Sequence, residues 1–324
     1  MSRILFSVCC MAAALALFPA AQAGAQSYPV KPIRMIVPFA PGGPNDVIGR
    51  VVAQKVSEQI GQPVIVDNRA GAGGAVGTAA VGTAPPDGYT ILISGTSSLA
   101  INPALYQKLP YEPLGDFAPV SLVGTAPSLL TMHPSVPVRS VKDLIALAKA
   151  RPGQLNYASG GIGSAPHLAG ELLNSMAGIK MVHVPFRGGG PSLTGVMSGQ
   201  ADLFMGGMSA AMPPVKNGQL RGIAVTSPKR SQFMPELPTI AETLPGYDVV
   251  NWYAIFAPAA TPKDIIARLN SEIVKAMAAP DIRKRFEQLA TDAATSTPDE
   301  LGAYHRSEIK KWANVVRTAG IKVE

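Results

Sequence analysis

Short apolar runs of strand length alternate along the chain with loops rich in glycine and serine, and a helical pattern follows each loop. Four such units have their apolar runs at 35–37, 64–66, 91–93 and 155–158. The first amides of a helix have no partner within it and lie at the positive end of its dipole. Each unit therefore directs hydrogen-bond donors above a strand end. Repeated without a neighbouring nucleophile, the pattern indicates a device for holding an anion.

The rest of the chain continues the same alternation. Further strands are predicted at 181–184, 203–205 and 222–225, with short helices between them. The C-terminal part is predicted to be helical from Pro262 onward, and its last helix carries Trp312. Alternation of this kind predicts an α/β protein with largely parallel sheets.

Capping signals set the bounds of two helices. Apolar residues recur with helical spacing over 47–56, and Gly61 follows as a stop signal. Ser140 and Asp143 resemble a capping box that begins a second helix, which Pro152 and Gly153 end. Strand–helix units on both sides of residue 125 indicate two lobes that face one cleft.

Composition narrows the class of partner. The 324 residues are 47% hydrophobic and 15% charged, which excludes a disordered chain, and the formal net charge is +7. The densest basic runs, 229–230 and 283–285, carry no interleaved aromatic residues. They are therefore interpreted as solvated surface and not as a nucleic-acid footprint. A small acidic ligand fits the positive balance better.

The N-terminal segment predicts export. Arg3 precedes an uninterrupted apolar run over 4–18, and small residues follow at a cleavage site after Ala23 or, as a second choice, after Ala25. The run is shorter than a membrane span. Both cysteines of the sequence lie inside it, so the mature protein has no thiol for a disulfide, a metal or a nucleophile. We expect residues 1–25 to be a signal peptide of a soluble periplasmic protein.

Two glycine-rich loops resemble nucleotide-binding motifs, but each lacks residues that such a motif requires. Gly161 and Gly163 begin a dinucleotide-like fingerprint, but Pro166 replaces its third glycine and no acidic strand end follows near 181–185. The loop at 71–74 lacks the lysine of a phosphate-binding loop. Two interpretations remain for each loop: its backbone amides bind an anion, or it is a tight turn without a ligand.

Catalytic and metal chemistry have little support. The four histidines do not stand at metal-ligand spacings, and no Gly-x-Ser-x-Gly elbow occurs. His167 differs in position, because it lies one turn inside the helix after the 159–164 loop and can donate to an anion there. Arg187 follows a strand beside a further glycine loop and is either a ligand contact or structural. Trp252 and Tyr253 are either core or cleft wall.

A family resemblance rests on many spaced motifs. These are Val37-Pro38-Phe39-Ala40-Pro41-Gly42-Gly43-Pro44-Asn45-Asp46, Val66-Asp67-Asn68-Arg69, Pro86-Asp87-Gly88-Tyr89-Thr90, Tyr157-Ala158-Ser159 with Gly163-Ser164 and His167, and Val184-Pro185-Phe186-Arg187-Gly188. From about Tyr28 to the C-terminus the chain resembles the receptors of tripartite tricarboxylate transporters, also called Bug proteins.

The resemblance implies a periplasmic binding protein fold of type 2, with two α/β lobes that close on a small carboxylate. Lobe 1 would be residues 27–125 plus 248–324, and lobe 2 would be residues 126–247. The loops 39–46 and 159–167 would face the ligand from opposite lobes. The ligand would then pass to the permease subunits of a membrane transporter.

We expect a monomeric receptor without cofactor, metal or catalytic residues, and with no nucleic-acid partner. The alternatives are an exported enzyme acting on a carboxylate or ester, and a sensor receptor without a permease. The expected ligand contacts combine backbone amides, hydroxyls, His167 and Arg187. They are Phe39, Ala40, Gly42, Gly43, Asp46, Thr96, Ser97, Ser98, Ser159, Gly161, Gly163, Ser164, His167, Arg187 and Gly206.

Two departures from the family pattern concern the ligand. Phe186 stands where the family often has tyrosine, and glycines at 206–207 stand where an acidic residue and asparagine are common. An α-amino acid would need an acceptor for its desolvated ammonium. The loss favours a plain carboxylate with an apolar or aromatic body over aspartate or glutamate, although Asp46 and Asp67 keep the amino acids open.

Titration with amino-acid and non-amino carboxylates of matched size tests this preference. We expect the non-amino carboxylates to bind more tightly, because no acid replaces the one lost at 206–207. Tighter binding of the amino acids would reverse the assignment of ligand class.

Overall fold

The computed structural model describes residues 28–321, so the predicted signal peptide lies outside the described residues. Ten strands in this range form one mixed sheet in the order β2-β1-β3-β9-β4-β7-β5-β6, and β8 and β10 also pair with β4. The strands are β1 (Ile33–Val37), β2 (Val64–Asn68), β3 (Thr90–Gly95), β4 (Phe117–Met132), β5 (Asn156–Ser159), β6 (Val182–Pro185), β7 (Leu203–Gly207), β8 (Arg221–Val225), β9 (Val250–Pro258) and β10 (Asp292–Ala293).

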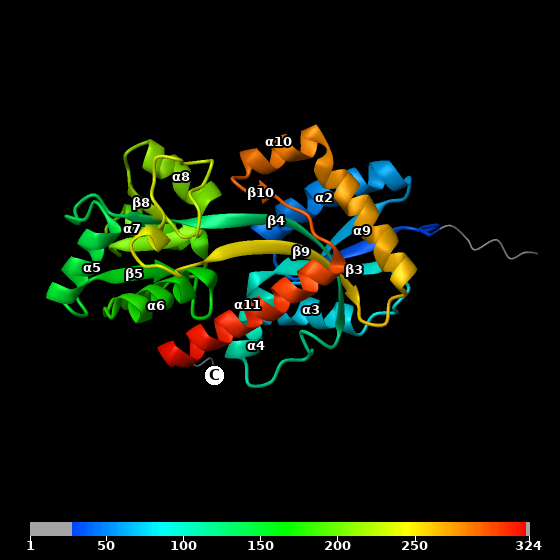
Figure 1. Cartoon of the computed structure of the whole chain (residues 1–324), viewed down its shortest axis with the longest axis horizontal. Helices are drawn as coiled ribbons and strands as arrows, with labels where there is room; N and C mark the ends of the chain where they lie inside the picture. Colours follow the sequence, from blue (N-terminus) through cyan, green and yellow to red (C-terminus); the bar gives the residue numbers. More distant parts are fainter. Residues whose placement is uncertain (1–27, 322–324) are drawn as a thin grey trace, which may run out of the picture.

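The helices cover both faces of this sheet (Figure 1). The α-helices are α2 (Pro44–Ile60), α3 (Ala75–Gly82), α4 (Asn102–Leu105), α5 (Val141–Ala150), α6 (Ala165–Ala177), α7 (Gly189–Met197), α8 (Met208–Lys216), α9 (Lys263–Ala278), α10 (Pro280–Gln288) and α11 (Pro298–Ala319). Short 3₁₀ turns η1 (Ala72–Gly74) and η3 (Ile240–Glu242) and a π-helix η2 (Thr96–Ile101) complete the order.

Two lobes lie end to end, and β4 and β9 run between them (Figure 1). One lobe holds β1–β3 with α2, α3, α9 and α10, and the other holds β5–β8 with α5–α8. The first part of β4 pairs antiparallel with β9 as far as Pro127, which lies opposite Val250. From Ser128 onward β4 pairs instead with β7 and β8. The same strand therefore belongs to the sheets of both lobes.

Thr226 forms hydrogen bonds at the position where β4 changes its pairing partner. Its buried hydroxyl accepts from the Ser128 amide at 2.9 Å and donates to the Val249 carbonyl at 2.6 Å. The Thr226 backbone amide donates to the Ser128 carbonyl at 3.0 Å and its carbonyl accepts from the Val249 amide at 3.0 Å. One residue thus joins β4 to the chain that leads into β9, and it satisfies polar groups that would otherwise be unpaired in the core.

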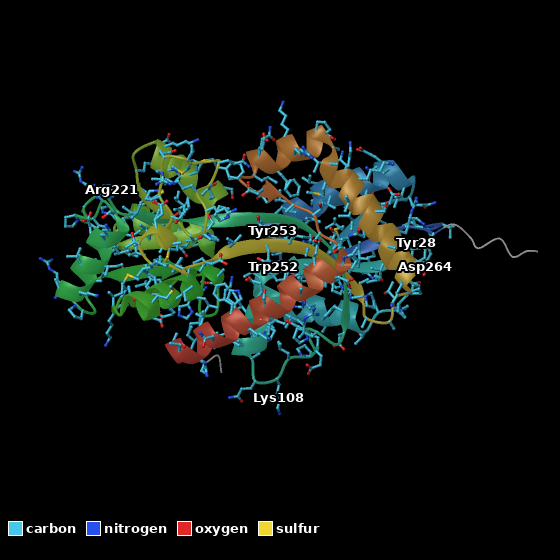
Figure 2. All side chains as sticks on the ribbon, viewed as in Figure 1. Tyr28, Lys108, Arg221, Trp252, Tyr253 and Asp264 are labelled. Atoms are coloured by element: carbon cyan, nitrogen blue, oxygen red, sulfur yellow. The ribbon has the colours of Figure 1, made fainter. Side chains whose placement is uncertain are left out.

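Side-chain alternation along β9 divides the core of the first lobe into two layers. Tyr253 and Ile255 pack with the residues of α2 and α9, whereas Trp252 and Phe256 pack with those of η2 and α11. This is the period-2 alternation of a strand buried on both faces. Trp252 and Tyr253 lie at mid-length of the molecule (Figure 2).

Helix α11 anchors this strand through a buried carboxylate. Glu308 Oε2 accepts from the indole nitrogens of Trp252 and Trp312, each at 3.1 Å. Lys311 pairs with the other carboxylate oxygen of Glu308 and lies 3.5 Å from Asp248. The helix also packs against η2, α4 and α6, so it contacts both lobes.

The prediction of largely parallel sheets is wrong. Within residues 28–321 the pairs β1–β2, β1–β3, β5–β6 and β5–β7 are parallel, but every pairing of β4 and β9 is antiparallel. Prolines and glycines interrupt the apolar pattern of β4, and such residues usually argue against a central strand. The structure accommodates them with register shifts near Pro119 and Gly124.

Most of the local predictions are confirmed. Three of the four strand–loop–helix units occur as predicted; in the third unit β3 extends to Gly95 and η2 begins at Thr96, so no loop separates them. Gly61 ends α2 in the left-handed conformation at φ 67°. The Ser140 side chain accepts from the Asp143 amide at 3.1 Å and begins α5. The C-terminal part from Lys263 is helical, with the short β10 as an addition.

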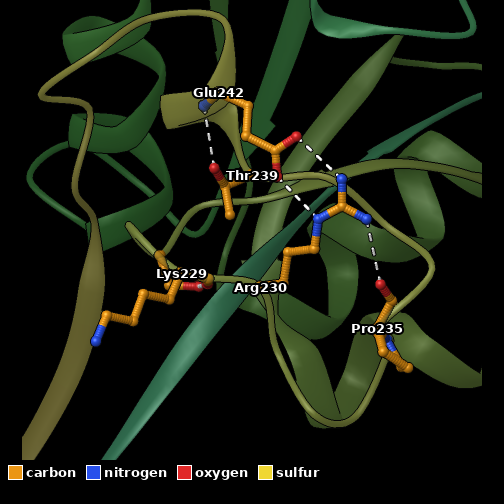
Figure 3. A network of polar contacts seen from close by, with 6 residues as sticks. Lys229, Arg230, Pro235, Thr239 and Glu242 are labelled. Atoms are coloured by element: carbon orange, nitrogen blue, oxygen red, sulfur yellow. Dashed lines mark hydrogen bonds and ion pairs between the residues drawn. The ribbon is translucent and has the colours of Figure 1, made fainter.

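The basic run at 229–230 has a structural role in the second lobe. The Arg230 guanidinium donates to both carboxylate oxygens of Glu242, at 2.9 and 3.0 Å, while Glu242 and Thr239 form a capping box (Figure 3). Arg230 Nη1 also lies 3.5 Å from the Pro235 carbonyl oxygen. This fork-like pair closes the loop between β8 and η3, in keeping with the geometry that Arg and carboxylate prefer.

Glu308→Ala is expected to lower the free energy of unfolding by about 2–6 kcal/mol, because two buried indole N–H groups lose their acceptor at about 1–3 kcal/mol each. Denaturant titration measures the loss. Glu308→Gln is the matched control, because its carbonyl oxygen still accepts from the indoles, and we expect a smaller loss. Equal losses in the two variants would contradict the role given to the shared acceptor.

Candidate functional site

A cavity of about 580 Å³ opens where the loops after five strands and the start of β9 converge. The first lobe contributes the loop between β1 and α2 and the start of η2. The second contributes the loops before α6, α7 and α8. The lining residues are Phe39, Ala40, Pro41, Gly43, Pro44, Asn45, Thr96, Ser97, Ser128, Gly160, Ser164, Ala165, Pro166, Gly188, Gly189, Gly207, Asn251, Trp252 and Tyr253.

Helix N-termini from both lobes reach this cavity. The first intrahelical hydrogen bonds run from Val47 to Gly43 in α2, from Leu168 to Ser164 in α6 and from Ser192 to Gly188 in α7, at 3.0–3.2 Å.

In each helix, the amides of the residues that precede this first bonded amide have no acceptor within the helix. They include the amides of the lining residues Asn45, Ala165 and Gly189. Each helix also adds the positive end of its dipole. The cavity can therefore hold an anion through backbone groups alone.

Asp46 stabilises the loop between β1 and α2 from the side that faces away from the cavity. Its carboxylate accepts from the Gly42 amide at 2.8 Å, from Asn68 Nδ2 at 2.9 Å and from Arg50 at 2.9 Å. Asn68 also donates to the Phe39 carbonyl at 3.0 Å. Burial by itself would raise the pKa of Asp46, but these hydrogen bonds outweigh it and hold the pKa below the usual range. Asp46 is buried and serves the loop instead of lining the cavity.

The opposite loop, between β5 and α6, rests on a pair of histidines. The imidazole rings of His167 and His183 stack with centroids 3.9 Å apart. His167 Nδ1 accepts from the Gly163 amide at 3.1 Å, and His183 Nε2 lies 2.6 Å from Ser159 Oγ. Ser159 Oγ in turn accepts from the Gly161 amide at 3.1 Å.

Both imidazoles are held neutral. Burial lowers the pKa of His167 to about 4. Burial and the neighbouring His167 lower the pKa of His183 to about 4. A charged imidazole here would lose hydration and face a second ring at van der Waals distance. The neutral pair therefore belongs to the packing under the loop.

Ser159 and His183 form the one serine–histidine contact at this loop, and the sequence alone did not reveal it. Ser159 is fully buried, and its oxygen is already engaged with both backbone groups of Gly161. A nucleophile must reach substrate as well as its base. Because Ser159 does not line the cavity, the pair positions the loop.

The structure brings six of the predicted site residues together at the cavity: Phe39, Ala40, Gly43, Thr96, Ser97 and Ser164. Gly42 lines an adjoining chamber. A larger set lies behind the cavity wall or away from it: Asp46, Ser98, Ser159, Gly161, Gly163, His167, Gly206 and the exposed Arg187.

Several lining residues were missing from the sequence-based set. Ser128 and Asn251 come from the crossing strands, and their side chains lie 3.3 Å apart. Gly188 and Gly207 precede α7 and α8, and the Gly-rich 188–190 stretch was the available signal for the former. The sequence left Trp252 as either a core residue or part of the cleft wall, and in the structure it is both.

Elsewhere on the molecule, a groove of about 330 Å³ lies beside α9 and α10 and includes Met277, Glu287 and Asp292. It is lined by helix sides and the β10 segment, so it lacks the converging amides. Within residues 28–321, no helix is both long and apolar enough to cross a bilayer. The same range contains no cluster of three His, Asp or Glu side chains suited to a metal ion.

Solved structures share this architecture. An R. palustris protein solved with adipate superposes with a TM-score of 0.81 at 34% identity, covering 91% of this chain and 99% of its own. MatC from Rhodopseudomonas palustris with bound malate gives 0.77 at 32% identity, covering 89% and 100%. The fold and cleft define a two-lobed solute-binding protein of the periplasmic type.

The family assignment follows from the sequence comparison. The model of the tripartite tricarboxylate transporter family receptor matches residues 48–321. Protein BugT of Bordetella pertussis is 38% identical over 307 residues, which cover 94% of each chain. The chain belongs to the tripartite tricarboxylate transporter receptor family.

The neutral histidine pair predicts a loss of stability in acid. Unfolded imidazoles, with ordinary pKa values near 6.5, take up protons between pH 6.5 and 4, whereas His167 and His183 resist protonation until about pH 4. The free energy of unfolding should therefore fall as the pH is lowered through this window.

Denaturant titration of a His167→Gln, His183→Gln double variant at pH 7, 5.5 and 4.5 measures this slope, which should become shallower. His133→Gln, in the turn after β4, is the matched control and should keep the wild-type slope. A double variant with an unchanged slope would show that other groups cause the acid sensitivity.

Proposed function

We propose that the protein captures a small carboxylate in the cleft between its lobes and delivers it to the permease of a tripartite transporter. One observation carries the proposal. Helix N-terminal amides from both lobes meet at one cavity whose lining residues, all within 28–321, include no Lys, Arg, His, Asp or Glu. Fixed backbone donors suit an anion and leave the bound charge without a competing counter-ion.

The available donors are enough for useful affinity. A hydrogen bond to a charged group contributes about 1.5–3 kcal/mol. Three or four such bonds, less the cost of immobilising the ligand, reach about −8 kcal/mol, which corresponds to micromolar binding. Thr96 and Ser97 line the same cavity and add hydroxyl donors, whereas the Ser164 hydroxyl already donates to the Gly161 carbonyl oxygen at 2.7 Å.

Relatives support this ligand class, since one solved structure carries adipate and another carries malate. Plain carboxylates suit this chain better than amino acids, because its two candidate counter-ions are engaged elsewhere. Asp46 binds Arg50, and Asp67 pairs with Arg34 and Arg69.

Export and assembly complete the proposal. The apolar N-terminal segment is the signal for export to the periplasm, with cleavage near Ala23 or Ala25. The mature receptor acts there as a monomer. Mass determination of the secreted protein reports both the cleavage point and the assembly state.

We assign the lobes to residues 27–125 plus 248–324 and to residues 126–247. The change of partner along β4 after Pro127 and the turn into β9 at Val250 support these bounds. Both lie beside the cavity, so a small rotation there moves the two halves of the donor set together.

Closure predicts a compact bound state. Addition of a ligand that bridges the lobes should reduce the radius of gyration in small-angle scattering and raise the melting temperature. A panel of mono-, di- and tricarboxylates is screened first by thermal shift. A carboxylate that raises the melting temperature but leaves the radius of gyration unchanged would argue against closure.

Gly43→Val tests the donor loop directly. A Cβ at residue 43 meets only the Ala40 carbonyl oxygen, at 3.7 Å, and the local φ of −77° suits any residue. The fold should survive, while the branched side chain blocks the approach to the start of α2 and weakens carboxylate binding at least tenfold.

Calorimetry with the best ligand of the panel measures this effect, and Ala267→Val on the exposed side of α9 is the control. Gly42 and Gly163 are less suitable targets, because their φ values of 85° and 77° would strain any other residue. Wild-type affinity in Gly43→Val would place the anion elsewhere.

A further inference from the structure

A second chamber of about 520 Å³ continues the cleft beyond the carboxylate cavity. The two spaces share Pro44, Gly189, Gly207, Asn251 and Tyr253, so together they form one elongated cleft. The starts of α2, α6 and α7 line the first chamber. The second lies between the side of α2, the starts of α7 and α8, and the segment after α10.

Side chains of the second chamber are mainly apolar. Ile48 comes from α2, Phe204 from β7, Met208 from α8 and Leu289 from the end of α10. Among its lining residues, all of which lie within 28–321, none is charged. A charged ligand group placed against these side chains would lose hydration without gaining a partner of opposite charge.

The far wall of this chamber is a strap at residues 289–291. Ala290 is buried against Met208 and Met234 of the second lobe, and its backbone adopts φ 47°. A residue other than glycine in this left-handed region costs free energy, which the surrounding packing must offset. The strap therefore encloses the apolar chamber between the lobes.

We propose that this chamber is a subsite for an apolar ligand body, so that the preferred ligand is a monocarboxylate with an alkyl or aromatic tail. The inference rests on the proposed function, because the carboxylate must occupy the first chamber. The tail then lies along Ile48, Phe204 and Met208. The start of α8 also opens into this chamber, and a second carboxylate held there is the competing arrangement.

Calorimetric titration with straight-chain acids separates the two arrangements. From propionate to hexanoate the affinity should rise about fourfold per methylene, the value expected for burial of each CH₂ group. Adipate has the chain length of hexanoate but carries a second carboxylate in place of the terminal methyl. We expect adipate to bind at least tenfold more weakly than hexanoate.

Gly190→Phe fills the chamber from α7. A Cβ at residue 190 meets no heavy atom within 4 Å, and this glycine lines only the second chamber. Hexanoate should lose its advantage over propionate, while propionate keeps its wild-type affinity within twofold. Gly43→Val, in the first chamber, should instead weaken both acids.

Ala210→Lys places a cation at the exposed mouth of the second chamber. It should reverse the preference, so that adipate binds more tightly than hexanoate. Circular dichroism and thermal melting establish that each variant is folded before its affinities are compared.

The outcomes distinguish this inference from the proposed function. If no carboxylate binds the wild-type protein, the proposed function fails. If propionate binds but affinity stays flat with chain length, or if adipate exceeds hexanoate in the wild-type protein, the apolar subsite is wrong while the carboxylate receptor stands.

Discussion

The antiparallel crossing of β4 and β9 is the constraint on which the other features of the molecule depend. Both strands run through the boundary between the lobes, and Thr226 ties them together where β4 changes partners. Glu308 anchors β9 from one side by accepting from Trp252. Because Ser128, Asn251 and Tyr253 line the cleft, the same crossing that joins the lobes also forms part of the cleft wall.

In the proposed function, the geometry of the backbone decides which ligand the cleft recognises. The donors belong to helix starts, so their positions are set by the packing of whole helices and not by flexible side chains. The polar residues that stand out, Asp46, Ser159 and the stacked histidines, lie one layer behind. Asp46, Ser159 and His167 each accept from one amide of a glycine-rich loop, and His183 contacts Ser159. Loss of any of them would act on binding through the shape of the loop.

The two proposals give the two chambers different roles. In them, helix-start amides hold a carboxylate in the first chamber, and the apolar side chains that line the second chamber contact the rest of the ligand. Gly206 and Gly207 have different positions relative to the two chambers. Gly207 borders both chambers, whereas Gly206 is buried, and a Cβ there would lie 1.7 Å from the ring of Phe204. The absence of a side chain at Gly206 thus lets Phe204 take its place in the wall of the second chamber.

The sequence by itself determined those helices, strands and caps that depend only on residues close together in the chain. The alternation of apolar runs with glycine loops, the stop at Gly61 and the cap at Ser140 are properties of short segments, and the motifs also identified the family. Only tertiary structure decided which loops line the cavity, because that depends on pairings between distant residues. The interrupted strand β4 is stabilised by partners in β7, β8 and β9, which lie 71 (Met132 to Leu203) to 141 (Phe117 to Pro258) residues away along the chain. Ser159 meets His183 only because β5 and β6 lie side by side in the sheet.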